Sequence, residues 1–146
     1  MANFLADAYR NSVVGKTTDY STRVDCDTDT LKAYFMDAGT DIPVVTDVFE
    51  NAHTGINPLF AAAQTIGTPT AGVVGVGVFD AADTVFTGAS VLTGSTTVEW
   101  LVVFKFITTA ADSPFLAAWD TATGLPLTPN GADVTVVWNA SGIWRF

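Results

Sequence analysis

The residues of this chain that could do chemistry are few, and the first group is an aspartate cluster. Asp25, Asp27 and Asp29 stand at alternate positions, which is how an EF-hand calcium loop begins. The other ligands of such a loop are missing. Thr30 takes the sixth position, where a glycine makes the sharp turn, and Met36 takes the twelfth, where a glutamate is needed. We therefore expect a solvated turn and no metal site.

Catalytic and cofactor-binding groups are equally scarce. The single histidine, His53, has no serine or cysteine nucleophile with an orienting acid nearby in the sequence, and a catalytic histidine needs such partners. Asp80 and Asp83 bracket a segment in which carboxylates would bind the backbone N–H groups of a turn. The glycines at 72, 75 and 77 lack the Gly-Lys-Ser/Thr of a phosphate loop. We expect no catalytic residue, no cofactor and no enzyme activity.

Four tryptophans, all in the C-terminal third, are the remaining candidates: Trp100, Trp119, Trp138 and Trp144. An aromatic platform there could stack on a sugar ring. Alternatively, these side chains pack in the core or at a subunit interface, since aromatic residues favour half-buried pleated surfaces. Packing is the preferred interpretation, and a carbohydrate site is the alternative.

Composition excludes several other classes of function. Hydrophobic residues make up 49% of the 146 residues and charged residues 14%, with 15 acids, 6 bases and a net charge of −9. No Lys or Arg lies between Lys32 and Lys105, so we expect no nucleic-acid partner. The uncharged stretch Thr54–Phe79 is interrupted by prolines and glycines, which argues against a membrane partner. A single cysteine, Cys26, excludes an intramolecular disulfide.

The elements that must position these residues are mostly β-strands. Runs of β-branched and aromatic residues between Gly, Pro and Asn turns predict an all-β sandwich or barrel of eight or nine short antiparallel strands. We expect one domain over residues 1–146, with an N-terminal arm over 1–24. In that arm Phe4–Ser12 places Leu5, Ala8 and Tyr9 on one helical face, with Asn3 as the N-cap.

The strands expected from this pattern are Thr30–Met36, Leu59–Ile66, Ala71–Val78, Thr84–Phe86, Ser90–Thr93, Thr97–Thr108, Phe115–Trp119, Val134–Trp138 and Ile143–Phe146. Alternation of side chains along a strand places every second residue on one face. The expected core positions are Leu31, Ala33, Phe35, Phe79, Leu101, Val103, Phe115, Val134 and Val136.

Several segments, in this order, resemble a family of small head proteins of tailed bacteriophages. They are Met1–Leu5 with Tyr9-Arg10, Asp29–Asp37, His53, Gly77–Phe86 and Asp120–Trp138. The most specific is Leu125–Val136, a turn with prolines and Asn-Gly that leads into a strand. The resemblance covers almost the whole chain.

The resemblance implies a jelly-roll-like antiparallel β-sandwich with a short N-terminal helix, acting as a capsid decoration (cement) protein. Such a protein would be made in the host cytoplasm and would bind the major capsid protein on the outer surface of the virion. It would also bind itself, as a homodimer or homotrimer. Negative charge fits the outer surface, because packaged DNA would repel it on the inner wall. The alternative is a jelly-roll carbohydrate- or receptor-binding module of a phage tail.

Both ends of the chain carry aromatic residues in segments too short to be stable alone. We therefore expect contacts between subunits, or with the capsid shell, at Phe4, Tyr9, Arg10, Trp144 and Phe146. The low charge of the chain predicts that these contacts are apolar and persist in high salt.

Overall fold

The computed structural model describes residues 3–7, 9–10, 24–37, 42–48, 63–68, 70–71, 77–87, 97–109 and 111–145. Within them the chain is all-β, with antiparallel pairing in each sheet and almost no helix. No helix in this part of the chain is long and apolar enough to cross a bilayer.

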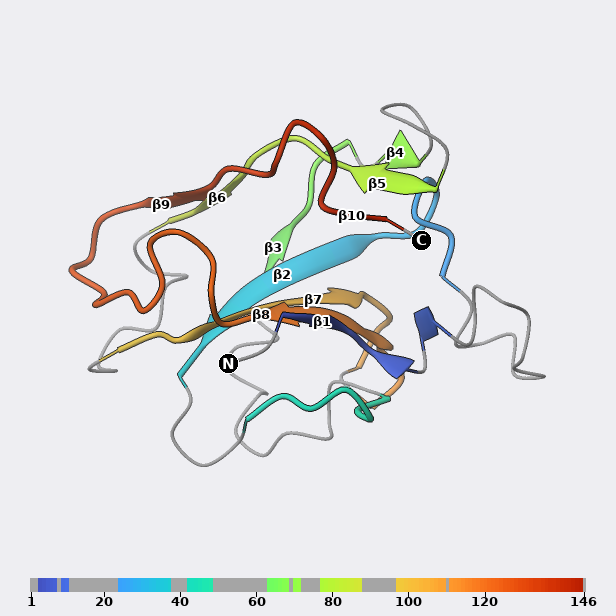
Figure 1. Ribbon diagram of the computed structural model, residues 1–146, viewed down its shortest axis with the longest axis horizontal. Helices are drawn as coiled ribbons and strands as arrows, with labels where there is room; N and C mark the ends of the chain where they lie inside the picture. Colours follow the sequence, from blue (N-terminus) through green and yellow to red (C-terminus); the bar gives the residue numbers. More distant parts are fainter. Residues whose placement is uncertain are drawn as a thin grey trace.

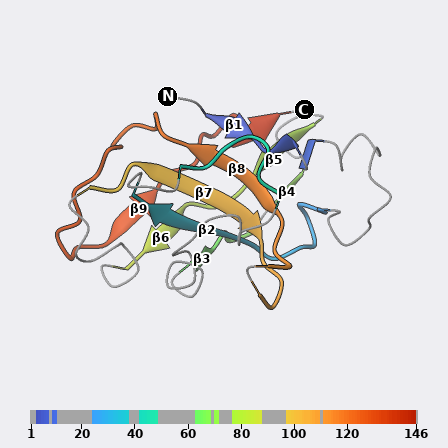
Figure 2. The same cartoon turned by 90° about the horizontal axis from the view of Figure 1, so that it is seen from below.

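The main sheet has five strands in the order β1-β8-β7-β2-β3 (Figure 1). Its long strands are β2 (Leu31–Met36), β7 (Trp100–Lys105) and β8 (Phe115–Trp119), and the edge strands are β1 (Phe4–Leu5) and β3 (Gln64–Thr65). β2 and β7 pair along their full lengths, from Leu31 opposite Lys105 to Met36 opposite Trp100. Seen from below, β8, β7 and β2 lie side by side across the molecule (Figure 2).

Two smaller sheets lie on one side of the main sheet (Figure 1). One contains β10 (Trp144–Arg145), β5 (Val78–Asp80) and β4 (Thr70–Ala71), and the other pairs β6 (Thr84–Phe86) with β9 (Val134–Val136). The ring of Phe35 on β2 lies 4.6 Å from that of Phe86 on β6. The ring of Trp119 on β8 stacks on Trp144 of β10 at 6.1 Å. These contacts join the two layers.

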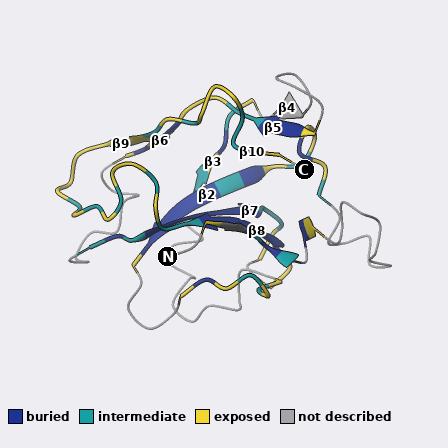
Figure 3. Cartoon of the chain, in the orientation of Figure 1, coloured by how far each residue is buried: buried dark blue, intermediate teal, exposed yellow. Residues whose placement is uncertain are grey.

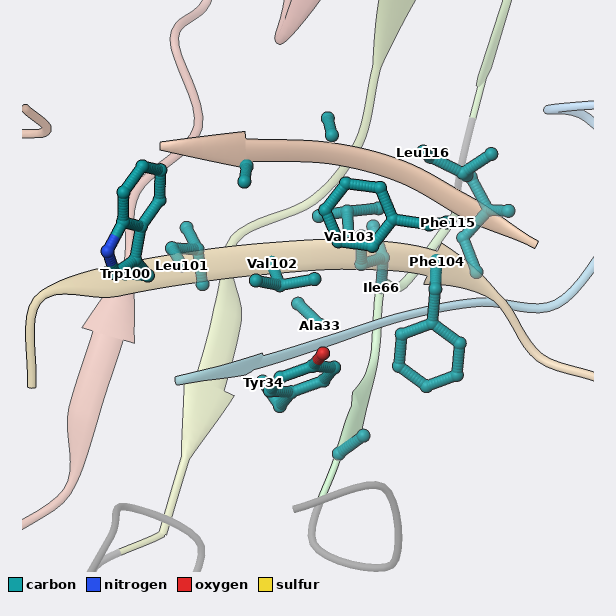
Figure 4. Close-up of a cluster of buried hydrophobic side chains, with 14 of the residues drawn as sticks. Ala33, Tyr34, Ile66, Trp100, Leu101, Val102, Val103, Phe104, Phe115 and Leu116 are labelled. Atoms are coloured by element: carbon teal, nitrogen blue, oxygen red, sulfur yellow. The ribbon is translucent and has the colours of Figure 1, made fainter. Parts of the chain in front are cut away.

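The core is centred on the main sheet, which is covered on both faces (Figure 3). On the face away from the smaller sheets, Tyr34 packs against Phe104 with ring centroids 5.7 Å apart (Figure 4). The expected core positions that are buried are Leu31, Ala33, Phe35, Phe79, Leu101, Val103 and Phe115. Val134 and Val136 are partly buried against this core.

The structure corrects the start of the expected N-terminal helix. Phe4 and Leu5, its first residues, form β1 and pair with Ala118 and Ala117 of β8, whereas Asp7, Tyr9 and Arg10 are helical, and the N–H of Arg10 donates to the carbonyl of Ala6 at 3.0 Å. Asn3 does not cap a helix, because its Oδ1 accepts hydrogen bonds from Thr121 Oγ1 at 2.8 Å and from two backbone N–H groups at the end of β8. A long-range partner strand outweighs a short segment's marginal helical preference. Ala8, Asn11 and Ser12 lie outside the described residues.

A second correction concerns the strand expected over Ala71–Val78. Ala71 and Val78 instead belong to two strands, β4 and β5, which pair antiparallel with Ala71 opposite Phe79, and residues 72–76 lie outside the described residues. Gly77, with φ of +72°, precedes β5, and glycine adopts this left-handed conformation readily. The strands expected over Thr84–Phe86 and Phe115–Trp119 are confirmed in full. The expected strand Ser90–Thr93 lies outside the described residues.

Candidate functional site

A pocket of about 680 Å³ lies between the two layers, beside β9. Phe35 of β2 and Leu101 of β7 form its floor. One wall is the loop segment Ala122–Leu125 together with Leu127, and the other is Val134–Val137 with Asn139. Several of these wall residues are exposed, so the pocket reaches the surface: Thr123, Gly124, Thr135, Val137 and Asn139.

The loop wall is fixed by backbone contacts that begin just before β7. Val98 and Leu127 exchange two backbone hydrogen bonds, of 2.7 and 2.8 Å. Within the loop, the N–H of Leu125 donates to the carbonyl of Ala122 at 3.0 Å, and the Leu125-Pro126 peptide bond is cis. These contacts hold Leu125 and Leu127 on the pocket.

The β9 wall follows a turn that the sequence specifies locally. Gly131 has φ of +82°, and the side chain of Asn130 accepts the N–H of Ala132 at 3.0 Å, as expected for an Asn-Gly turn. β9 then alternates, with Val134 and Val136 turned partly inward and Thr135 outward.

The outer face of the β6–β9 sheet carries two exposed valines. Val137 is 73% exposed, and Val85, which lies opposite Thr135, is 50% exposed. Sequence reasoning missed this face. The available signal was the adjacent pair Val136-Val137, because two apolar residues in succession cannot both face the core of an alternating strand.

The structure brings two of the five expected contact residues together, inside this chain. Tyr9 is 2% exposed and Trp144 is 8% exposed, and their rings meet edge to face at 5.9 Å. Arg10 is exposed and forms an ion pair with Asp7. Phe4 lies in β1, and Phe146 lies outside the described residues. The burial of Tyr9 and Trp144 is thus provided by this chain's own side chains.

The Tyr9 hydroxyl contacts the single cysteine. Tyr9 Oη lies 3.0 Å from Cys26 Sγ, and burial raises the pKa of the Cys26 thiol to about 11. Burial likewise raises the pKa of Tyr9. A reactive cysteine requires a lowered pKa and access, so this arrangement favours a structural role for Cys26.

The tryptophans pack mainly against one another and against the core. Trp100 and Trp144 are buried. Trp119 and Trp138 are partly buried, with ring centroids 6.1 Å apart. The indole N–H of Trp138 donates to Thr84 Oγ1 at 3.1 Å. These contacts fit the packing interpretation of the aromatic group.

The carboxylates of the Asp25–Asp29 turn face backbone N–H groups and a lysine. Asp25 Oδ1 accepts the N–H of Asp27 at 3.0 Å, which together with other hydrogen bonds lowers the pKa of Asp25. Asp29 Oδ2 accepts the N–H of Asp25 at 2.7 Å and lies 2.9 Å from Lys105 Nζ. Among the residues that the structure describes, no three His, Cys, Asp or Glu side chains are grouped to hold a metal ion.

The other acidic candidates are Asp80, the last residue of β5, and Asp83, which immediately precedes β6. Asp83 Oδ1 accepts the backbone N–H of Trp138 at 3.0 Å, a contact between the start of β6 and the end of β9 and not within a local turn. His53 lies outside the described residues. No family model matches the chain, and no curated protein matches its sequence.

Proposed function

We propose that this chain is a jelly-roll-type capsid decoration protein. It binds the major capsid protein on the outside of a tailed double-stranded DNA phage head and stabilises the shell. The observation that carries the proposal is the pairing of two segments through which the chain resembles this family. Gly77–Phe86 contains β6, Leu125–Val136 contains β9, and these strands form one sheet.

This β6–β9 sheet has the surface that such a protein needs. Its outer face exposes Val85 and Val137, and an apolar pocket adjoins it. A cement protein buries additional surface between capsid subunits. Because it binds the assembled shell and not the separate subunits, its binding stabilises the shell. Exposed apolar side chains on a rigid sheet favour a binding role of this kind over a catalytic role.

Charge supports the outer surface as the location. The chain carries a net charge of −9, which packaged DNA would repel from the inner wall. The same proposal includes self-association as a homodimer or homotrimer. It includes no enzyme activity, no cofactor, and no nucleic-acid or membrane partner.

The test is a mixing experiment with undecorated heads assembled from the major capsid protein encoded in the same genome. We expect the purified protein to co-sediment with these heads and to appear as regular surface density in negative stain. The variant Val137→Asp should weaken binding. Ile42→Asp is the matched control, because Ile42 is 54% exposed and belongs to segment 42–48, which lies on the opposite side of the main sheet (Figure 1). Heads that remain bare would refute the proposal.

The receptor-binding alternative receives no specific support from the tryptophans, because they pack against one another. It predicts a different result, namely saturable quenching of tryptophan fluorescence by a saccharide. We expect no such change.

A further inference from the structure

The wall of the pocket formed by β9 is a strand edge. Val134, Thr135, Val136 and Val137 all line the pocket. Successive side chains of a strand point to opposite faces, so four consecutive residues can border one space only along the edge of the strand. β9 pairs with β6 on its other side and is a terminal strand of this two-stranded sheet.

The backbone polar groups on this edge point into the pocket. The N–H of Trp138 donates to Asp83 Oδ1, on the β6 side. N–H groups two residues apart in an antiparallel strand point the same way, so those of Val134 and Val136 face β6, and those of Thr135 and Val137 face the pocket. Outside the β6–β9 ladder, no hydrogen bond among the described residues involves the backbone of Thr135 or Val137.

An open strand edge of this kind is a template for another strand. The edge comprises the three residues of β9 and the adjacent Val137, about 13 Å at the usual rise per residue of an extended chain. The far wall, with Leu125 and Leu127, and the floor, with Phe35 and Leu101, are apolar. A segment that binds in this pocket beside β9 therefore presents apolar side chains to the pocket floor at every second position.

The surroundings of the pocket are acidic. Asp133 immediately precedes β9 and Asp83 contacts its end. No Lys or Arg occurs between Lys105 and Arg145. This charge favours an occupant with basic ends and disfavours a second copy of a chain whose own net charge is −9.

We propose that β9 and the adjoining pocket bind an extended segment of a partner protein, with alternating apolar side chains and Lys or Arg at its ends, which adds as a third strand to the β6–β9 sheet. Main-chain hydrogen bonds to Thr135 and Val137 supply register, and the pocket selects the side chains. This binding mode goes beyond the capsid proposal and does not depend on it.

The test uses a synthetic nine-residue peptide of alternating Thr and Val with a Lys at each end, titrated into the full chain and followed by amide NMR. We expect shifts and slowed hydrogen exchange at the amides of Thr135 and Val137. N-methylation of the peptide's pairing amides, which leaves the protein unchanged, should weaken binding about two- to tenfold per hydrogen bond removed. The same peptide with Glu ends should bind more weakly.

Two protein variants complete the experiment. Thr135→Pro removes an N–H that faces the pocket and should weaken peptide binding, whereas Thr135→Val keeps that N–H and should bind as the parent does. No response at Thr135 and Val137 would overturn the proposal. Binding that is indifferent to N-methylation and to Thr135→Pro would also overturn it, and would indicate a pocket for a small apolar ligand instead.

Discussion

Trp144 stacks on Phe79, with ring centroids 4.3 Å apart and planes inclined by 20°. The two residues also lie directly opposite each other in the pairing of β10 with β5. Trp144 additionally stacks on Trp119 of β8 and meets Tyr9 edge to face. One side chain near the C-terminus thus joins the N-terminal segment, the main sheet and a smaller sheet.

Trp144→Ala should therefore destabilise the fold by about 3–5 kcal/mol, the usual cost of removing a large buried aromatic side chain. Urea unfolding followed by circular dichroism measures this change. Arg145→Ala, at the exposed neighbouring position, should alter stability by less than about 0.5 kcal/mol. If Trp144→Ala kept full stability and lost head binding, Trp144 would belong to an interface and not to the core.

Stability should fall in alkaline solution because of Cys26. Burial raises its pKa from about 9 to about 11, so the folded protein keeps a proton that the unfolded chain loses at lower pH. This stabilising contribution is complete below about pH 9 and disappears as the pH rises to about 11, at up to about 1.4 kcal/mol per pH unit for one proton. Urea unfolding between these pH values measures it.

Cys26→Ser is the control for this pH dependence, because serine does not titrate in that range. The loss of stability that remains in this variant at alkaline pH comes from Tyr9, because burial also raises the pKa of Tyr9. An identical alkaline slope in the parent and in Cys26→Ser would contradict the assignment to the thiol.

Gly142→Ala should destabilise the fold more than Gly124→Ala. Both glycines have positive φ, +104° and +96°, which costs an alanine about 1–2 kcal/mol. A Cβ at Gly142 would also overlap Val78 Cγ1, whereas one at Gly124 would meet no atom within 4 Å. Overpacking adds about 1–3 kcal/mol at the first site. Equal melting temperatures for the two variants would show that the clash is relieved without cost.

Chelation should leave the melting temperature unchanged. The carboxylates of Asp25 and Asp29 accept backbone N–H groups, and Asp29 also pairs with Lys105. Thermal unfolding with EDTA, with and without added Ca²⁺, measures this. A drop in EDTA that Ca²⁺ restores would reveal a cation site at this turn.

Head binding, if the capsid proposal holds, should persist when NaCl is raised from about 0.1 M to about 1 M, because burial of Val85 and Val137 is not screened as exposed ion pairs are. Co-sedimentation at both salt concentrations measures this. Shedding at high salt would indicate ionic contacts. Deletion of the first ten residues is unsuitable as a binding test, because it removes β1 and the buried Tyr9.

The sequence by itself determined the all-β class, and it located β2, β6 and β8 to within one residue. Their signals are local, because a strand shows its alternation within a few residues and its turns are marked by Gly, Pro and Asn. For the same reason the Asn130-Gly131 turn before β9 could be recognised, and the aspartate cluster could be interpreted as a turn from its own spacing.

Tertiary structure decided what depends on distant partners. Leu5 fits a helical face in isolation and becomes a strand only because Ala117 of β8 is beside it. In the sequence alone, Tyr9 and Trp144 resemble exposed aromatic residues near the two ends of the chain. In the structure, Phe79 and Trp119 cover Trp144. The pocket beside β9 also requires assembly, because its floor, its loop wall and its strand wall come from separate parts of the chain that only packing brings together.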